Sequence, residues 1–132
     1  MICMMAETNF QKLQVWNKSS DLVECVYKIT WTFPNKEMYG LISQMRRASI
    51  SIASNIAEWD QRMSVRENVR FLYMAKWSAA EMQSHIMISY RLWFIGKDVF
   101  DNINRQIYDI LKMLSSLIHY KVKNPSNPSK AI

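Results

Sequence analysis

The chain has 132 residues, of which 49% are hydrophobic, and this suits one domain with its own core. Its net charge of +6 favours polyanionic partners such as RNA, DNA or acidic proteins, although many proteins that bind no nucleic acid are equally basic. With two cysteines, no recognisable signal peptide and no apolar run of membrane length, we expect a cytoplasmic protein without a disulfide framework.

Helix breakers are rare, with only 2 Gly and 3 Pro, and this indicates an all-helical chain. Residues 1–11 are expected to form an N-terminal arm. Apolar spacing predicts a first helix over residues 13–32, which Pro34 ends because the residue before a proline is pushed out of the helical region. Asn35 can then cap a second helix that continues to Glu58.

A capping box marks the start of the third helix. The Ser64 hydroxyl can accept a hydrogen bond from the Glu67 amide while the Glu67 side chain reaches back. This helix is expected over residues 65–94, and Gly96 is its natural stop. Asp98 can cap the fourth helix.

The fourth helix has apolar residues at steps of three and four, the pattern of a seam in an antiparallel bundle. These residues are Phe100, Ile103, Ile107, Ile110, Leu114 and Leu117. Four helices with short connections predict an all-α fold, an antiparallel up-down-up-down four-helix bundle over residues 12–122. The polar, Pro-interrupted residues 123–132 are expected to be a disordered tail.

One face of the second helix is an ordered polar stripe beside an apolar face. The stripe consists of Gln44, Arg47, Ser51, Ser54, Asn55 and Glu58. These side chains have directional hydrogen-bonding groups, unlike the mixed Lys and Glu of an ordinary solvated face. One interpretation is RNA contact through Arg46, Arg47 and Asn55. The other, which we favour, is a subunit interface or an intramolecular network in which Arg47 and Glu58 bond across helices.

A basic and aromatic edge follows at the start of the third helix. Arg62, Arg66 and Arg70 step by four, and Tyr73 and Trp77 continue the line. Arginine for phosphate and aromatic rings for stacking on bases are the chemistry of single-stranded RNA binding. The alternative is that the rings pack between subunits while the arginines pair with neighbours such as Glu67.

Catalysis finds little support in the sequence. His85 lies one turn after Glu81, but the carboxylates and Glu-x-x-His pairs of a four-helix di-iron site are missing. No glycine-rich phosphate loop and no nucleophile with a base are present. We therefore expect no enzymatic activity, no catalytic residue, no metal site and no cofactor.

Four segments carry a family resemblance. They are FQKLQVWNKS at 10–19, TFPNKEMYGL at 32–41, QMRRASISIASNIAE at 44–58, and FLYMAK followed by SAAEM within 71–82. Together they resemble the bacterial 23S rRNA intervening-sequence protein family, also called the four-helix bundle protein family. The resemblance implies a small helical protein that assembles as a ring-like homo-oligomer, a pentamer. Some members are encoded inside insertions in 23S rRNA genes, and distant relatives look like accessory subunits of diversity-generating reverse transcriptases.

Three positions depart from the family's pattern. Trp59 and Trp77 stand where the family usually has glycine, and Asn68 stands where it usually has an aromatic residue. A left-handed backbone at Trp59 would be costly, and Trp77 needs a pocket or an exposed face.

The sequence thus predicts a self-assembling, non-catalytic protein that binds structured RNA, such as rRNA, or a ribonucleoprotein through a basic surface. The alternative is a protein-interaction adaptor, for example an accessory subunit of a reverse transcriptase. A ring would multiply the positive charge, and salt-sensitive affinity grows with the number of phosphates neutralised.

Overall fold

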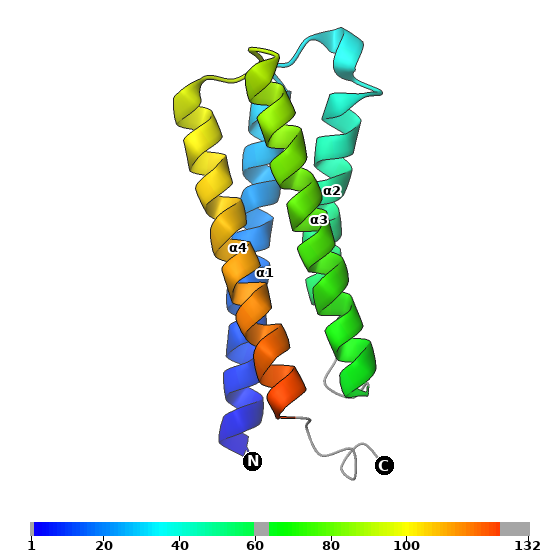
Figure 1. Ribbon diagram of the computed structural model, residues 1–132, viewed down its shortest axis with the longest axis vertical. Coiled ribbons are helices and arrows are strands. Elements are labelled where there is room, and N and C mark those ends of the chain that lie inside the picture. The colour runs from blue at the N-terminus through cyan, green and yellow to red at the C-terminus, as the bar shows by residue number, and fades with distance from the viewer. Residues whose placement is uncertain (1, 60–63, 125–132) are drawn as a thin grey trace.

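The computed structural model describes residues 2–59 and 64–124, and within these ranges the protein consists of helices without strands. The helices are α1 (Ile2–Thr30), the short 3-10 helix η1 (Asn35–Glu37), α2 (Leu41–Glu58), α3 (Val65–Arg91) and α4 (Lys97–Lys123). Figure 1 shows that successive long helices run in opposite directions along one axis. Helix α1 packs on α2 and α4, and α3 packs on the same two helices. The predicted all-α four-helix bundle is confirmed.

The core lies along the inward faces of the four helices. It is built by residues at steps of three and four, including Leu22, Val26, Met45, Ile52, Ile56, Leu72, Met82, Ile86, Ile103, Ile107, Ile110 and Leu114. All of these side chains are buried, and each contributes about 1.5–3 kcal/mol relative to an exposed position. The seam predicted on α4 is therefore the core face of that helix, although Phe100 at its start is only half-buried.

The first helix is longer than the sequence pattern indicates. Helix α1 begins at Ile2, so residues 2–11, expected as an N-terminal arm, form its first turns. The reason is local, because this segment contains neither Gly nor Pro and is rich in good helix formers such as Met, Ala and Gln. The helix ends at Thr30, shortly before Pro34, as expected.

Asn35 does not cap the second long helix, which corrects the sequence-based prediction. It opens η1 instead, and α2 begins later, at Leu41, with Gly40 in the N-cap position. The Glu37 carboxylate accepts a hydrogen bond of 3.4 Å from the Leu41 amide. Glu37 therefore satisfies one of the free N–H groups that an N-cap side chain usually serves.

The connection between α3 and α4 contains an unusual left-handed residue. Helix α3 ends at Arg91 rather than near residue 94, and Trp93 has a φ of 65°, whereas Gly96 does not have a positive φ. The Phe94 amide bonds the Ser89 carbonyl and the Trp93 amide bonds the Tyr90 carbonyl, which is a Schellman motif. Trp93 thus takes the position that glycine normally fills.

Of the caps predicted for α3 and α4, the structure confirms one in part and corrects the other. The Ser64 hydroxyl accepts from the Glu67 amide at 3.3 Å, which confirms that half of the predicted capping box. Gly96 is the N-cap of α4, and Asp98 lies in its first turn, where its charge suits the helix dipole. Helix α4 reaches Lys123, and the rest of the predicted tail, from residue 125, lies outside the described residues.

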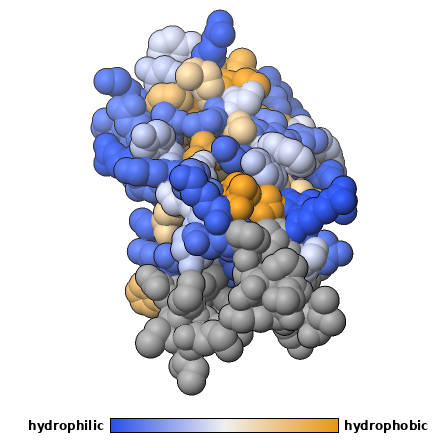
Figure 2. All heavy atoms as spheres, turned by 60° about the horizontal axis from the view of Figure 1, so that its bottom comes forward, coloured by the Kyte–Doolittle hydropathy of each residue, from blue (hydrophilic) through white to orange (hydrophobic). Residues whose placement is uncertain are grey.

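Among the coloured residues in Figure 2, hydrophilic ones cover most of the surface and hydrophobic ones form small patches between them. Among the described residues, no helix combines the length and the apolar composition needed to cross a membrane.

Candidate nucleic-acid interface

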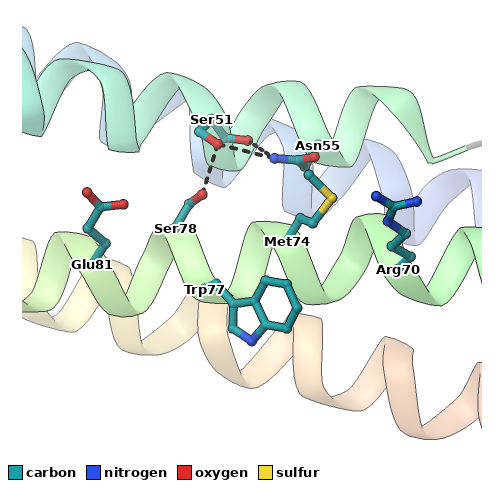
Figure 3. A pocket seen from close by; sticks show the side chains of 7 residues that line it. All are labelled: Ser51, Asn55, Arg70, Met74, Trp77, Ser78 and Glu81. Atoms are coloured by element: carbon teal, nitrogen blue, oxygen red, sulfur yellow. Dashed lines mark hydrogen bonds between the residues drawn. The ribbon is translucent and has the colours of Figure 1, made fainter.

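A groove of about 360 Å³ lies between α2 and α3 on the outside of the bundle. We call it the α2–α3 groove, and its lining residues are Ser51, Asn55, Arg70, Met74, Trp77, Ser78 and Glu81. Figure 3 shows Arg70 and Glu81 at opposite ends, with Ser51 and Asn55 facing α3 from α2. The polar stripe of α2 and the basic and aromatic edge of α3, which the sequence presents as separate features, therefore meet in one place.

The floor of the groove is a short hydrogen-bond network. The hydroxyls of Ser51 and Ser78 are 2.8 Å apart and link the two helices. Asn55 donates from Nδ2 to the Ser51 carbonyl at 2.9 Å and to the Ser51 hydroxyl at 3.2 Å. These bonds orient the Asn55 side chain through its amide nitrogen, and its Oδ1 keeps its capacity to accept a hydrogen bond.

The α3 rim of the groove is basic and aromatic. Tyr73 and Trp77 lie one turn apart with ring centroids separated by 6.2 Å and an interplanar angle of 32°. Trp77 is 65% exposed, and Arg70, one turn before Tyr73 on α3, is exposed as well. The Arg70 guanidinium makes no hydrogen bond or ion pair with any described residue, so its five donors are available to a ligand.

The rest of the α2 stripe is exposed rather than networked. The side chains of Gln44, Arg47 and Glu58 face solvent and form no bond within the described part of the chain. Neither Arg47 nor Glu58 makes the expected bond to another helix within the described residues. The link across helices is made by Ser51 and Ser78 instead.

The arginines predicted to bind nucleic acid divide into separate groups. Arg66 is exposed in the first turn of α3, one turn before Arg70. Arg46 lies apart from the groove, where its Nε donates to the Thr30 hydroxyl at 3.0 Å. Arg62 lies outside the described residues.

Sequence reasoning missed Met74, Ser78 and Glu81 as groove residues. The signal was present, because positions 70, 74, 77, 78 and 81 repeat at steps of three and four and so share one face of a helix. The Glu81 carboxylate also lies 3.3 Å from Nε2 of His85. Across the described ranges, no three His, Cys, Asp or Glu residues are grouped as metal ligands would be.

The family is shown by a match over most of the chain. The family model described as 23S rRNA-intervening sequence protein matches residues 11–116. The chain belongs to this family. A crystal structure from Bacteroides thetaiotaomicron, of a protein of unknown function from the S23 ribosomal protein family, is similar with a TM-score of 0.74. At 24% identity the alignment covers 83% of this chain and 98% of that one, and it shows the shared fold. No curated protein matches the chain.

Trp59 and Trp77, the two departures that the resemblance indicated, lie in opposite environments. Trp59 ends α2 with an ordinary φ of −63°, so no left-handed residue is needed there, and its side chain is only 1% exposed. Trp77 is instead exposed on the rim of the α2–α3 groove, which is one of the two environments expected for it. Asn68, the third departure, is fully buried on α3.

Two lysines surround the buried Trp59. The Lys12 ammonium donates to the Trp59 carbonyl, and Nζ of Lys121 lies 5.3 Å from the centre of the indole. Lys121 is only 5% exposed, and burial lowers the pKa of its ammonium from the usual 10.5. Lys12 therefore links α1 to the end of α2, and Lys121 is too deeply buried to meet an anionic ligand.

Proposed function

We propose that this protein is a cytoplasmic, self-assembling and non-catalytic RNA-binding protein, and that RNA binds along the α2–α3 groove and the start of α3. One observation carries the proposal. Arg70 has no partner among the described residues, and it shares one edge of α3 with the exposed, paired Tyr73 and Trp77, at one end of the α2–α3 groove.

The side chains of this surface fit an RNA ligand and contribute little to the stability of the fold. A guanidinium binds phosphate oxygens through parallel hydrogen bonds, and aromatic faces stack on bases. Exposed aromatic rings contribute little to bundle stability, since they are not in the core. Arg66 and Arg47 add two exposed positive charges on the helices that border the groove.

Assembly strengthens the proposal. Five copies with a charge of +6 each carry about +30 in total, and affinity for RNA grows with the number of phosphates that are neutralised. The proposed pentamer rests on the family resemblance, and sedimentation or light scattering of the purified protein tests it directly.

The first experiment is a titration of nucleic-acid-free protein with labelled 23S rRNA fragments, double-stranded DNA and single strands at several salt concentrations. We expect RNA affinity to fall steeply with salt. The double variant Arg66→Ala/Arg70→Ala should bind more weakly. Its slope of log affinity against log salt should be smaller by about 1 for each phosphate that the variant no longer neutralises.

The matched control is Arg91→Ala/Arg105→Ala, which removes the same charge from exposed positions outside the groove. If both double variants weaken binding equally, net charge alone explains the affinity and the proposed surface is wrong. If the unmodified protein shows no preference for RNA at any salt concentration, the RNA-binding function itself is wrong.

A protein-interaction adaptor is the second candidate, and the aromatic residues at the opposite end of the bundle favour it. Trp31, Tyr39 and Trp93 are 81%, 96% and 92% exposed. The connections that carry them lie at the same end of the molecule in Figure 1, and Phe33 and Phe94 join these connections with ring centroids 5.3 Å apart. Tryptophan and tyrosine are among the residues most enriched at protein-binding hot spots.

Trp93→Gly tests the adaptor function. Glycine adopts a positive φ without steric cost, so the variant should unfold at higher denaturant, with a gain of up to about 1 kcal/mol. If the indole serves a partner protein, the more stable variant should lose that partner in pull-downs. Retention of every partner would count against an adaptor role for this end.

A further inference from the structure

The α2–α3 groove has a different chemical character at each position along its length. Arg70 supplies a positive charge at one end, Met74 and Trp77 supply an apolar middle, and Glu81 supplies a carboxylate at the other end (Figure 3). A uniform polyanion would be repelled by a carboxylate inside its binding site. The groove therefore suits a ligand that is itself divided into an anionic part and a flat, uncharged part.

The middle of the groove suits a planar ring. Trp77 presents an indole that is 65% exposed, and the polarizable Met74 thioether, one turn earlier on α3, points toward α2 (Figure 3). Tyr73 is a neighbour of Trp77, with ring centroids 6.2 Å apart. A tryptophan side chain has only two rotatable bonds, so it loses little entropy when a base stacks on it.

The uncharged and anionic polar groups of the groove that can serve a ligand are mainly acceptors. Both hydrogen bonds from the Asn55 amide go from Nδ2 to Ser51, so Oδ1 is the group left for a ligand. One Glu81 oxygen bonds His85, and the carboxylate keeps further acceptor capacity. Acceptors in this position fit the exocyclic amino groups of adenine, cytosine or guanine, because carboxylates and amide oxygens accept from such groups.

We propose that the α2–α3 groove binds one unpaired nucleotide, with its phosphate on Arg70, its base against Trp77 and the amino group of that base toward Glu81. The inference rests on the proposed function and deepens it, because it names the part of the RNA that is read. A paired base cannot reach the groove, since its faces are stacked and its pairing edge is occupied. The RNA element bound here is thus a loop, bulge or single strand.

The test uses fluorescently labelled RNAs and the full-length protein. One RNA is a fully paired blunt duplex, a second is the same duplex with a single-stranded loop, and a third is an unstructured trinucleotide. We expect the loop RNA to bind at least about ten-fold more tightly than the duplex, which corresponds to the stacking of one base. The Trp77→Ala variant should lose this difference, while Trp77→Phe should keep most of it.

Trp93→Ala is the matched control, because it removes an exposed tryptophan far from the groove along the chain. Glu81→Gln gives a second readout. It adds an amide donor where a carboxylate stood, so binding of a uridine loop should rise relative to an adenosine or cytidine loop. Trp77 and Glu81 are exposed helix residues, and circular dichroism checks that each variant is folded.

Each outcome separates this inference from the proposed function. If duplex and loop RNAs bind equally and Trp77→Ala changes nothing, the inference is overturned while RNA binding by the basic surface stands. If trinucleotides bind at Trp77 but rRNA fragments do not, the inference holds for short strands and the proposed function is wrong. If a 5′-mononucleotide binds as tightly as the trinucleotide, the ligand is a free nucleotide, and if nothing binds, both proposals are overturned.

Discussion

Two clusters of one arginine and two aromatic rings lie on different parts of the bundle surface. In the first, the Arg46 guanidinium lies 4.5 Å from the centre of the Tyr27 ring and 5.9 Å from the Trp31 ring, and its Nε bonds Thr30. In the second, Arg70 shares one edge of α3 with Tyr73 and Trp77 but bonds none of the described residues.

These two clusters show how structural and functional arginines can be separated when the residue types are the same. The first cluster joins α1 to α2, so its cation–π contacts and hydrogen bond stabilise the fold. The second cluster lies entirely on α3, so its arginine does not join two helices. Residues that contribute little to the fold and remain exposed are better candidates for ligand contact.

The greatest change in stability is expected at one of the two unusual tryptophans. Trp59→Ala should lower the free energy of unfolding by about 3–5 kcal/mol, because it removes a fully buried indole and leaves a cavity. Trp77→Ala should change it by no more than about 0.5 kcal/mol, as expected for an exposed helix position. Urea unfolding followed by circular dichroism measures both, and equal losses would contradict the contrast drawn between the two sites.

A smaller change is expected from the arginines of the two clusters. Arg46→Ala should destabilise the protein by about 2 kcal/mol, because it removes a charged hydrogen bond and two cation–π interactions, and should leave RNA affinity nearly unchanged. Arg70→Ala should lower RNA affinity and leave the free energy of unfolding nearly unchanged. If each of the two variants lowers both stability and RNA affinity, the distinction between the two clusters is wrong.

Lys121 gives a third test, through pH. Its lowered pKa means that the unfolded chain holds this proton at pH values where the folded protein has lost it. Stability from this group therefore rises with pH between the folded pKa and the usual value of 10.5. The gain in urea midpoint from about pH 7 to about pH 10 should be larger in the unmodified protein than in Lys121→Met.

The exposed Lys123, near Lys121 in the last turn of α4, supplies the control for titration of other groups. Lys123→Met should keep the full gain with pH. An identical pH response in the Lys121 and Lys123 variants would show that burial beside Trp59 has no effect on stability.

The least change is expected at the floor of the groove. Ser78→Ala removes the 2.8 Å bond to Ser51 and should cost about 1 kcal/mol or less, because the bond is only partly buried. RNA affinity should fall less than in Trp77→Ala. A larger drop in affinity for Ser78→Ala would mean that the position of Asn55, rather than stacking, governs binding.

The helices are predictable because each is encoded locally, whereas their ends are less so. Apolar residues at steps of three and four and the Ser64 capping box identify α3 and α4 directly. Asn35 and Gly96 are good end signals in isolation, but neither marks the helix boundary predicted from it. Phe94 packs against Phe33 across the two connections, and the local sequence does not reveal such a contact between distant segments.

The two halves of the candidate site are predictable as stripes, but their meeting is not. Helical periodicity alone places Ser51 and Asn55 on one face of α2, and Arg70 and Trp77 on one face of α3. Nothing in that periodicity says which helix each stripe faces. It also cannot tell that Arg46 binds α1 while Arg70, with the same chemistry, bonds no described residue.

The four helices, the apolar seam of each and the family to which the chain belongs follow from the sequence alone, because these depend on residue order and periodicity. The tertiary structure was needed to establish that Ser51 and Ser78 join α2 to α3, that Trp59 is buried and that Trp77 is exposed. Burial and hydrogen-bond partners depend on how the helices are rotated and aligned against each other. That arrangement minimises exposed apolar area over the whole core rather than along any one segment, so no single stretch of sequence specifies it.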